Sequence, residues 1–141
     1  MGTATNWIDA PWSEIYEAMG NIHNWPLWNG AIQEVRETER SNEFVVRVNI
    51  LGWIYCRVKD QLPQEKQFAY ELFGKGNRET GTLRLVEESF GACLIEYQVK
   101  HEGWLKLLTP LESVTSWRVG RLKELCENGS VVDPYGRGMS Q

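Results

Sequence analysis

The sequence predicts a single α+β domain in which a long C-terminal helix covers one face of an antiparallel sheet. Two observations carry this prediction. From about residue 32 to 102, apolar residues alternate with polar ones, which is typical of strands with one buried face. From residue 104 to 126, apolar residues recur every third or fourth position, which indicates an amphipathic helix. A one-sided sheet must bury its apolar face, and this helix is the candidate cover.

The N-terminal part predicts one short strand and a first helix. An extended start over residues 7–10 precedes Pro11, and a proline suits the first turn of a helix. Apolar residues at helical spacing then predict a helix over residues 13–19. Gly20 or Asn21 is expected to end it.

A second short helix is predicted in a segment rich in aromatic residues. Pro26 suits the first turn of a helix over residues 26–31, and it restricts the preceding Trp25 to an extended conformation. Trp28 falls within the same helix. So much aromatic surface beside a short helix indicates core packing, a lid over a ligand or an exposed patch.

Five or six strands joined by short turns follow this helix, so the sheet is predicted to be antiparallel. Glycine and proline mark the turns between them, at Gly52, at Pro63, in the run 74–77 and at Gly91.

The strand around residues 53–59 has two possible phases. The phase that buries Ile54 and Val58 is preferred over the phase that buries Arg57 and Lys59, because two cations are easier to solvate outside. The second phase would give a far more polar and cationic interior.

Pro110 interrupts the helical pattern of residues 104–126. It predicts either a kink or the true first turn of the helix, with Thr109 as the N-terminal cap. The folded domain is expected to span residues 1–129, and residues 130–141 are expected to form a loop-like tail.

Composition excludes several classes of partner. The chain of 141 residues carries a net charge of −4 and a pI near 5.3, which argues against nucleic acid or an anionic membrane as the main partner. No apolar run approaches the roughly 20 residues of a membrane span, and the N-terminus resembles no targeting signal. Three widely spaced cysteines favour reduced thiols in a cytoplasmic protein. Seven tryptophans are many for this length, so several are expected to line a pocket.

Familiar cofactor motifs are missing from the sequence. The two histidines, His23 and His101, lie far apart, and there is no metal-binding spacing, phosphate loop or nucleophile elbow. Cys56 and Cys93 fall on apolar strand faces and are interpreted as inert core thiols. We therefore expect neither a metal nor a cofactor.

Three segments carry a resemblance to a known family. They are IDAPWSEIYEAMGNIHNWPLWNGAIQEV (8–35), GTLRLVEESFGACLIEYQV (81–99) and RLKELCENG (121–129). With them the sequence resembles the START / pollen-allergen / polyketide-cyclase (SRPBCC) superfamily, in particular its polyketide cyclase/dehydrase-like branch. The resemblance implies a helix-grip fold, in which a curved antiparallel sheet of about seven strands wraps around the C-terminal helix. It also implies an internal cavity that two short helices close at one end.

The resemblance places Trp25 and Trp28 at the closed end of that cavity, either as a plug or in direct contact with a ligand. A cavity of more than about 300 Å³ is expected, which is the lower size of small-molecule sites. The residues expected to bind the ligand share inward-facing positions; they are Trp25, Trp28, Phe44, Val46, Tyr70, Ile95, Leu111 and Thr115.

Four polar residues are candidates for acid–base chemistry because they fall on faces that look inward: Glu79, Tyr97, His101 and Arg118. A buried charge is costly unless it is paired, so Glu79 and Arg118 form either a structural ion pair or part of a wet cavity mouth. His101 or Glu79 would be the base, with Tyr97, Tyr70 or Arg118 as hydrogen-bond donors.

Two functions from different classes fit this pattern. The first, which we favour, is an enzyme resembling polyketide cyclases and aromatases, which would cyclise, dehydrate or isomerise a small hydrophobic or polyketide-like molecule without a cofactor. The second is a non-catalytic carrier of a lipid or natural product. A third and weaker interpretation is a protein-partner module, which would need an exposed apolar patch. A monomer or homodimer is expected.

Overall fold

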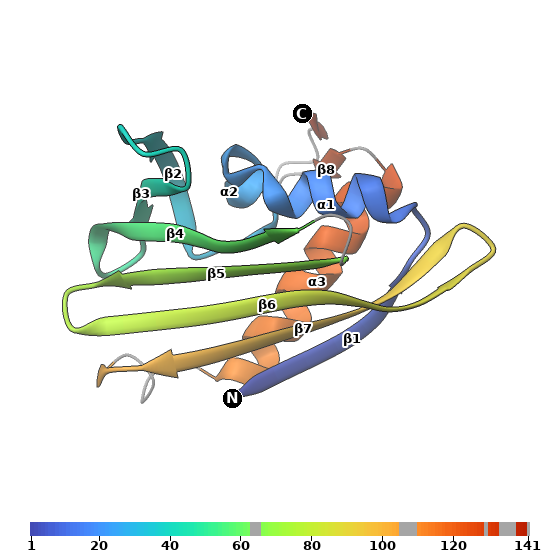
Figure 1. The fold of residues 1–141 in the computed structure, drawn as a ribbon. Coiled ribbons are helices and arrows are strands. Elements are labelled where there is room, and N and C mark those ends of the chain that lie inside the picture. Colours follow the sequence, from blue (N-terminus) through green and yellow to red (C-terminus); the bar gives the residue numbers. More distant parts are fainter. Residues whose placement is uncertain (63–65, 105–109, 129, 133–137, 141) are drawn as a thin grey trace.

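The computed structural model describes residues 1–62, 66–104, 110–128, 130–132 and 138–140. One sheet of seven strands, in the order β1-β7-β6-β5-β4-β3-β2 and antiparallel throughout, curves around the helix α3 (Figure 1). The strands are β1 Gly2–Ile8, β2 Ile32–Glu37, β3 Glu43–Val48, β4 Gly52–Leu62, β5 Gln67–Gly74, β6 Asn77–Ser89 and β7 Ala92–Glu102. The helices are α1 Trp12–Gly20, η1 Ile22–Asn24, α2 Trp25–Trp28 and α3 Leu111–Asn128. The predicted helix-grip fold of the α+β class is confirmed.

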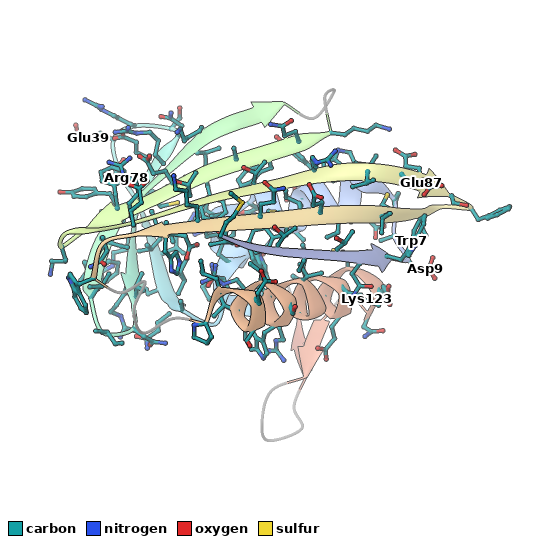
Figure 2. All side chains as sticks on the ribbon, turned by 90° about the horizontal axis from the view of Figure 1, so that it is seen from below. Trp7, Asp9, Glu39, Arg78, Glu87 and Lys123 are labelled. Carbon is teal, nitrogen blue, oxygen red and sulfur yellow. The ribbon has the colours of Figure 1, made fainter. Side chains whose placement is uncertain are left out.

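Helix α3 packs against the concave face of the sheet, and its apolar stripe supplies part of the core (Figure 2). At one end of the molecule the Nζ atom of Lys123 donates a hydrogen bond of 2.8 Å to the carbonyl of Trp7, which ties the end of α3 to β1. The apolar residues of α3 that are almost wholly buried are Val119, Leu122 and Leu125.

The prediction for the second helix is wrong in its details. Helix α2 ends at Trp28 rather than at residue 31, and Trp25 has helical φ and ψ angles of −59° and −38° instead of an extended conformation. The local preference before Pro26 is overridden by burial of the Trp25 ring, whose Nε1 atom donates a hydrogen bond of 2.6 Å to the carbonyl of Met19.

Helix α3 begins at Leu111, so the predicted start at Trp104 is too early. The amide of Val114 donates to the carbonyl of Pro110 at 3.0 Å, and this proline therefore marks the beginning of the helix, as one of the two alternatives had it. The proposed cap Thr109 lies outside the described residues.

The prediction of a loop for residues 130–141 is wrong for two segments. Ser130–Val132 (β8) and Gly138–Ser140 (β9) pair as antiparallel strands. Strands of three residues are too short to show the alternation from which strands are recognised.

The phase of β4 agrees with the preferred alternative. Ile54 and Val58 are buried, whereas Tyr55 is exposed and Arg57 forms an ion pair with Glu43 at 3.2 Å on the outer face. The interior of the sheet is therefore apolar along this strand.

The turn between β3 and β4 contains a strained residue. Ile50 has a φ angle of 76°, and this β-branched side chain is 78% exposed. A left-handed conformation costs an L-residue about 1–2 kcal/mol, and β-branched residues adopt it least often. The side chain is largely exposed, so burial in the core offsets little of that cost.

Candidate functional site

A cavity of about 520 Å³ lies between the first half of α3 and the ends of the strands at one side of the sheet. This side carries the β3–β4 and β5–β6 turns and lies on the left in Figure 1. The predicted cavity above about 300 Å³ is confirmed. Its walls are formed by Gly30, Ala31, Val48, Asn49, Ile50, Leu51, Ile54, Leu72, Asn77, Arg78, Glu79, His101, Glu102, Ser113, Val114, Trp117 and Arg118.

Three of the four predicted acid–base residues line this cavity: Glu79 on β6, His101 on β7 and Arg118 on α3. The fourth, Tyr97, lies one layer behind the wall, in contact with Arg118. The structure thus brings together residues that are up to 39 positions apart in the chain.

The predicted ligand-binding residues do not line this cavity. Most of them are buried in the hydrophobic core instead. None of the residues of α1 or α2 contributes to the cavity wall either, which differs from the expectation that two short helices close one of its ends. The residues outside the wall are Trp25, Trp28, Phe44, Val46, Tyr70, Ile95, Leu111 and Thr115.

Glu79 is the centre of a buried hydrogen-bond network. Its Oε2 atom accepts from Nη1 of Arg118 at 2.9 Å and from the hydroxyl of Tyr70 at 2.7 Å. Its Oε1 atom is 3.3 Å from Nη2 of Arg118, which donates to it, and 2.7 Å from Nε2 of His101. Arg118 also donates to the hydroxyl of Tyr97 at 3.2 Å, and the hydroxyls of Tyr70 and Tyr97 are hydrogen-bonded to each other.

The charges in this network stabilise each other. Burial alone would raise the pKa of Glu79, but the Arg118 guanidinium and the hydrogen bond from His101 outweigh it and lower the pKa to about 2. Burial likewise opposes the charge on Arg118, and Glu79 outweighs it and keeps the pKa of that guanidinium well above its ordinary value. Of the two alternatives for this pair, the structure shows the buried ion pair, and both residues also line the cavity.

His101 is the member of the network with an unused hydrogen-bonding atom. Since Glu79 is ionised, the Nε2 atom of His101 carries the proton that it shares with the carboxylate. The Nδ1 atom is buried and has no hydrogen-bond partner among the described residues. A buried polar atom of this kind calls for a hydrogen-bond partner, and the His101 residue lines the cavity.

A β-bulge sets the register that pairs Glu79 with His101. The pairing of β6 with β7 shifts by one residue between Leu85 and Glu87, so that Glu79 lies directly opposite His101. Without the shift Glu79 would lie opposite Glu102, and the carboxylate would have no imidazole beside it.

Gly81 makes room for the Tyr70 ring. The two residues are paired across β5 and β6, and a Cβ atom at position 81 would lie 2.2 Å from the ring. Trp25 and Trp28 pack against the two tyrosines of the network. The ring centroids of Trp25 and Tyr70 are 4.6 Å apart, and those of Trp28 and Tyr97 are 6.1 Å apart. Trp25 and Trp28 therefore support the tyrosines that bind Glu79 and Arg118, and this explains the aromatic segment at the end of the short helices.

Sequence reasoning missed the rim of the cavity. Trp117 lines it and is 50% exposed, and its ring lies so close to Gly30 that a Cβ atom there would be 2.7 Å from it. The spacing of Val114, Trp117 and Arg118 on one helix face could have shown this wall. Ile50 and the neighbouring Leu51 carry no such signal, because they lie in a turn.

In the described part of the chain there is little support for a metal site or for a reactive thiol. No three histidine, cysteine or acidic side chains come together there in a way that could hold a metal ion. Burial raises the pKa of the Cys56 thiol to about 12 and also raises that of Cys93, so both thiols stay protonated. Within these residues, no helix combines the length and the apolar character that crossing a bilayer requires.

No protein-family model and no curated protein matches the sequence. Solved structures do match the fold. A START superfamily protein from Mycobacterium smegmatis has a TM-score of 0.70 at 18% identity, over 89% of this chain and 96% of that one. The di-domain ARO/CYC protein StfQ from the steffimycin biosynthetic pathway has a TM-score of 0.69 at 15% identity, over 91% of this chain and 45% of that one.

Norcoclaurine synthase from Thalictrum flavum is also similar, with a TM-score of 0.64 at 10% identity over 87% of this chain and 83% of that one. Structural similarity at sequence identities this low is evidence for a shared fold but not for a shared activity. The seven-stranded sheet, the long C-terminal helix and these neighbours agree: the protein has a helix-grip fold, the fold it shares with these solved structures.

Proposed function

We propose that the protein binds a small, largely apolar molecule in this cavity and catalyses its cofactor-free cyclisation, dehydration or isomerisation by proton transfer. The observation that carries the proposal is His101 in the cavity wall, with Nε2 held by Glu79 and Nδ1 buried without a partner among the described residues. An imidazole held on one side by a carboxylate and free on the other is a suitable general base.

The network assigns a different role to each member. Glu79, whose pKa is lowered to about 2, is too weak a base to take a proton near neutral pH, so it positions His101 and fixes its tautomer. Arg118 places a positive charge in the wall, where an oxyanion could develop. Tyr97 and Tyr70 lie behind Glu79 and Arg118 and keep them in place.

The walls indicate the kind of ligand. The cavity wall combines apolar residues, among them Val48, Ile54 and Trp117, with the polar group around Glu79. A molecule with a ring system and at least one oxygen function would satisfy both parts of the wall. Fold neighbours named as ARO/CYC proteins support a polyketide-like compound as the substrate class.

A carrier without catalysis is the second candidate. It is favoured by the saturation of Glu79, since each of its oxygens already accepts two hydrogen bonds. In that case the same network would only orient the ligand. As part of this proposal the protein acts in the cytoplasm, because Cys56, Cys93 and Cys126 are all free thiols.

Filling the cavity tests whether it binds a ligand at all. Val114 lines it, and a tryptophan at this position would occupy part of its volume. We expect Val114→Trp to weaken the binding of hydroxylated two- and three-ring aromatic compounds by about tenfold or more, because overpacking costs about 1–3 kcal/mol. Ser116→Trp on the exposed face of the same helix is the matched control and should bind like the wild type.

Fluorescence titration and calorimetry measure both affinities. If no compound of this kind binds the wild type, or if both variants bind as well as the wild type does, the cavity is not a ligand site.

A further inference from the structure

We propose that Trp117 sets the size limit of the ligand and that Gly30 positions its ring for this role. This inference deepens the proposed function and rests on it, because it assumes that ring compounds occupy the cavity. Trp117 is thus a specificity-determining residue, and Gly30 is a positioning residue that acts through it. Both residues line the cavity, Trp117 from α3 and Gly30 from the turn that follows α2.

The outer edge of the Trp117 ring lies directly on the backbone of Gly30. A Cβ atom at position 30 would be 2.7 Å from Cη2 and 2.8 Å from Cζ3 of the ring, which is closer than real Cβ atoms come. The φ angle of Gly30 is not in the left-handed region, so the backbone at this position would accept an alanine. What excludes a side chain here is therefore the ring of Trp117.

The segment that carries Gly30 is held in place from two sides. Asn49, in the turn between β3 and β4, donates from Nδ2 to the carbonyl of Gly30 at 3.4 Å and from its amide to the carbonyl of Ala31 at 3.1 Å. On the other side, Oδ1 of the buried Asn29 accepts from the amide of Ala31 at 3.2 Å. A side chain added at position 30 would therefore displace the ring of Trp117 more easily than the backbone.

The Trp117 ring is placed for contact with a ligand. It is 50% exposed although it lines the cavity, so burial within the fold accounts for only part of its surface. Its neighbours four residues away on α3, Ser113 and Arg121, are both polar. The guanidinium carbon of Arg121 lies 5.4 Å from the ring centroid. The contacts with Gly30 and Arg121 thus hold the ring as a fixed part of the wall.

A fixed aromatic wall limits the width of the ligand, because it cannot yield as a flexible side chain does. One extra or missing methylene group in an apolar pocket changes the preference between two ligands by about 10–200-fold. A further fused ring is larger than a methylene group. We therefore expect the position of Trp117 to change the preference between ligands of different ring number by about tenfold or more.

The affinities for 2-naphthol, with two fused rings, and 1-hydroxypyrene, with four, test the role of Trp117. Trp117→Leu should shift the ratio of the two affinities by about tenfold or more towards 1-hydroxypyrene, because the indole ring no longer narrows the cavity. Trp104→Leu is the matched control, since this tryptophan is 48% exposed and does not line the cavity. It should keep the wild-type ratio. Isothermal titration calorimetry measures all the affinities.

A double-variant cycle tests the role of Gly30. Gly30→Ala should weaken the binding of 2-naphthol about fivefold or more, because the methyl group displaces the ring against which the ligand packs. In the Trp117→Leu background the same substitution should change this affinity by less than about twofold, because no ring is left to displace. Gly120→Ala is the control: its Cβ would meet nothing within 4 Å, and it should bind 2-naphthol like the wild type.

The results separate this inference from the proposed function. If the wild type binds 2-naphthol but Trp117→Leu keeps the wild-type ratio, Trp117 does not set the size limit, and the proposed function stands. Equal weakening by Gly30→Ala in both backgrounds would show that Gly30 does not act through Trp117. If Gly30→Ala does not fold, the ratio measured with Trp117→Leu decides alone. A wild type that binds neither compound overturns both proposals.

Discussion

Replacing Arg118 with methionine is expected to lower the free energy of unfolding by about 3–5 kcal/mol at neutral pH, because it leaves the carboxylate of Glu79 buried without its cation. Glu79 and Arg118 are 8% and 4% exposed, and two hydrogen bonds of 2.9 and 3.3 Å join them. Methionine has a similar volume and keeps the core filled, so the loss of stability measures the effect of removing the positive charge. Denaturation by urea at pH 7 measures it.

The pH dependence of this loss has a definite sign. In the wild type the pKa of Glu79 is lowered from 4.5 to about 2, so its contribution to stability is complete above about pH 4.5 and is lost as the pH falls towards 2. In Arg118→Met burial becomes the dominant influence and raises the pKa of Glu79. The buried carboxylate then destabilises the fold at neutral pH, and its protonation at lower pH reduces the difference from the wild type.

The double variant Arg118→Met/Glu79→Gln is the control. It removes both charges and should recover much of the stability, whereas Glu79→Gln alone leaves the Arg118 guanidinium buried and unpaired. An Arg118→Met protein that unfolds at the same urea concentration as the wild type at pH 7 would contradict the buried ion pair.

Replacing His101 with glutamine is expected to lower turnover by about 10²–10⁴-fold, the usual contribution of a general base. Affinity for the substrate should change by no more than about threefold, since glutamine keeps a polar group in the cavity wall. Glu79→Gln should also lower turnover, because it removes the group that orients His101. Tyr97→Phe should cost less, because it removes one hydroxyl of the supporting network.

Single-turnover kinetics beside a binding titration measure both quantities for each variant. His23→Gln is the matched control, because this other histidine is exposed, pairs with Glu37 at 3.2 Å and does not line the cavity. If His101→Gln and Glu79→Gln keep wild-type turnover, the acid–base assignment is wrong. If none of the proteins turns over a compound that they all bind, the carrier function replaces the enzyme.

Most of the fold could be predicted from the sequence, because it follows from local periodicity. The alternation around Ile54 and Val58 set the face of β4, and the two-residue turn at Lys75 and Gly76, both with positive φ, was recognisable by its glycine. The helical spacing that included Arg118 placed it on the inner stripe of α3. These features depend on residues that are close in the chain.

The layout of the site could be predicted only in part, because it depends on register and on tertiary packing. Glu79 and His101 were expected on inner faces, but the bulge after Leu85 that places them opposite each other leaves no clear local pattern. Trp25 and Trp28 were expected at the closed end of the cavity, either as a plug or in contact with a ligand; they are buried outside the cavity wall and pack against Tyr70 and Tyr97. Which large side chains fill the core and which ones border a cavity is decided by the path of α3.

A crystal structure with a bound aromatic hydroxy compound, chosen as the tightest binder among those titrated, tests the central claim most directly. We expect the ring system between Val48, Ile54 and Trp117, and the hydroxyl about 2.6–3.2 Å from Nδ1 of His101. A ligand lodged between Trp25 and Trp28, or one in the cavity whose polar group faces away from His101, would contradict it.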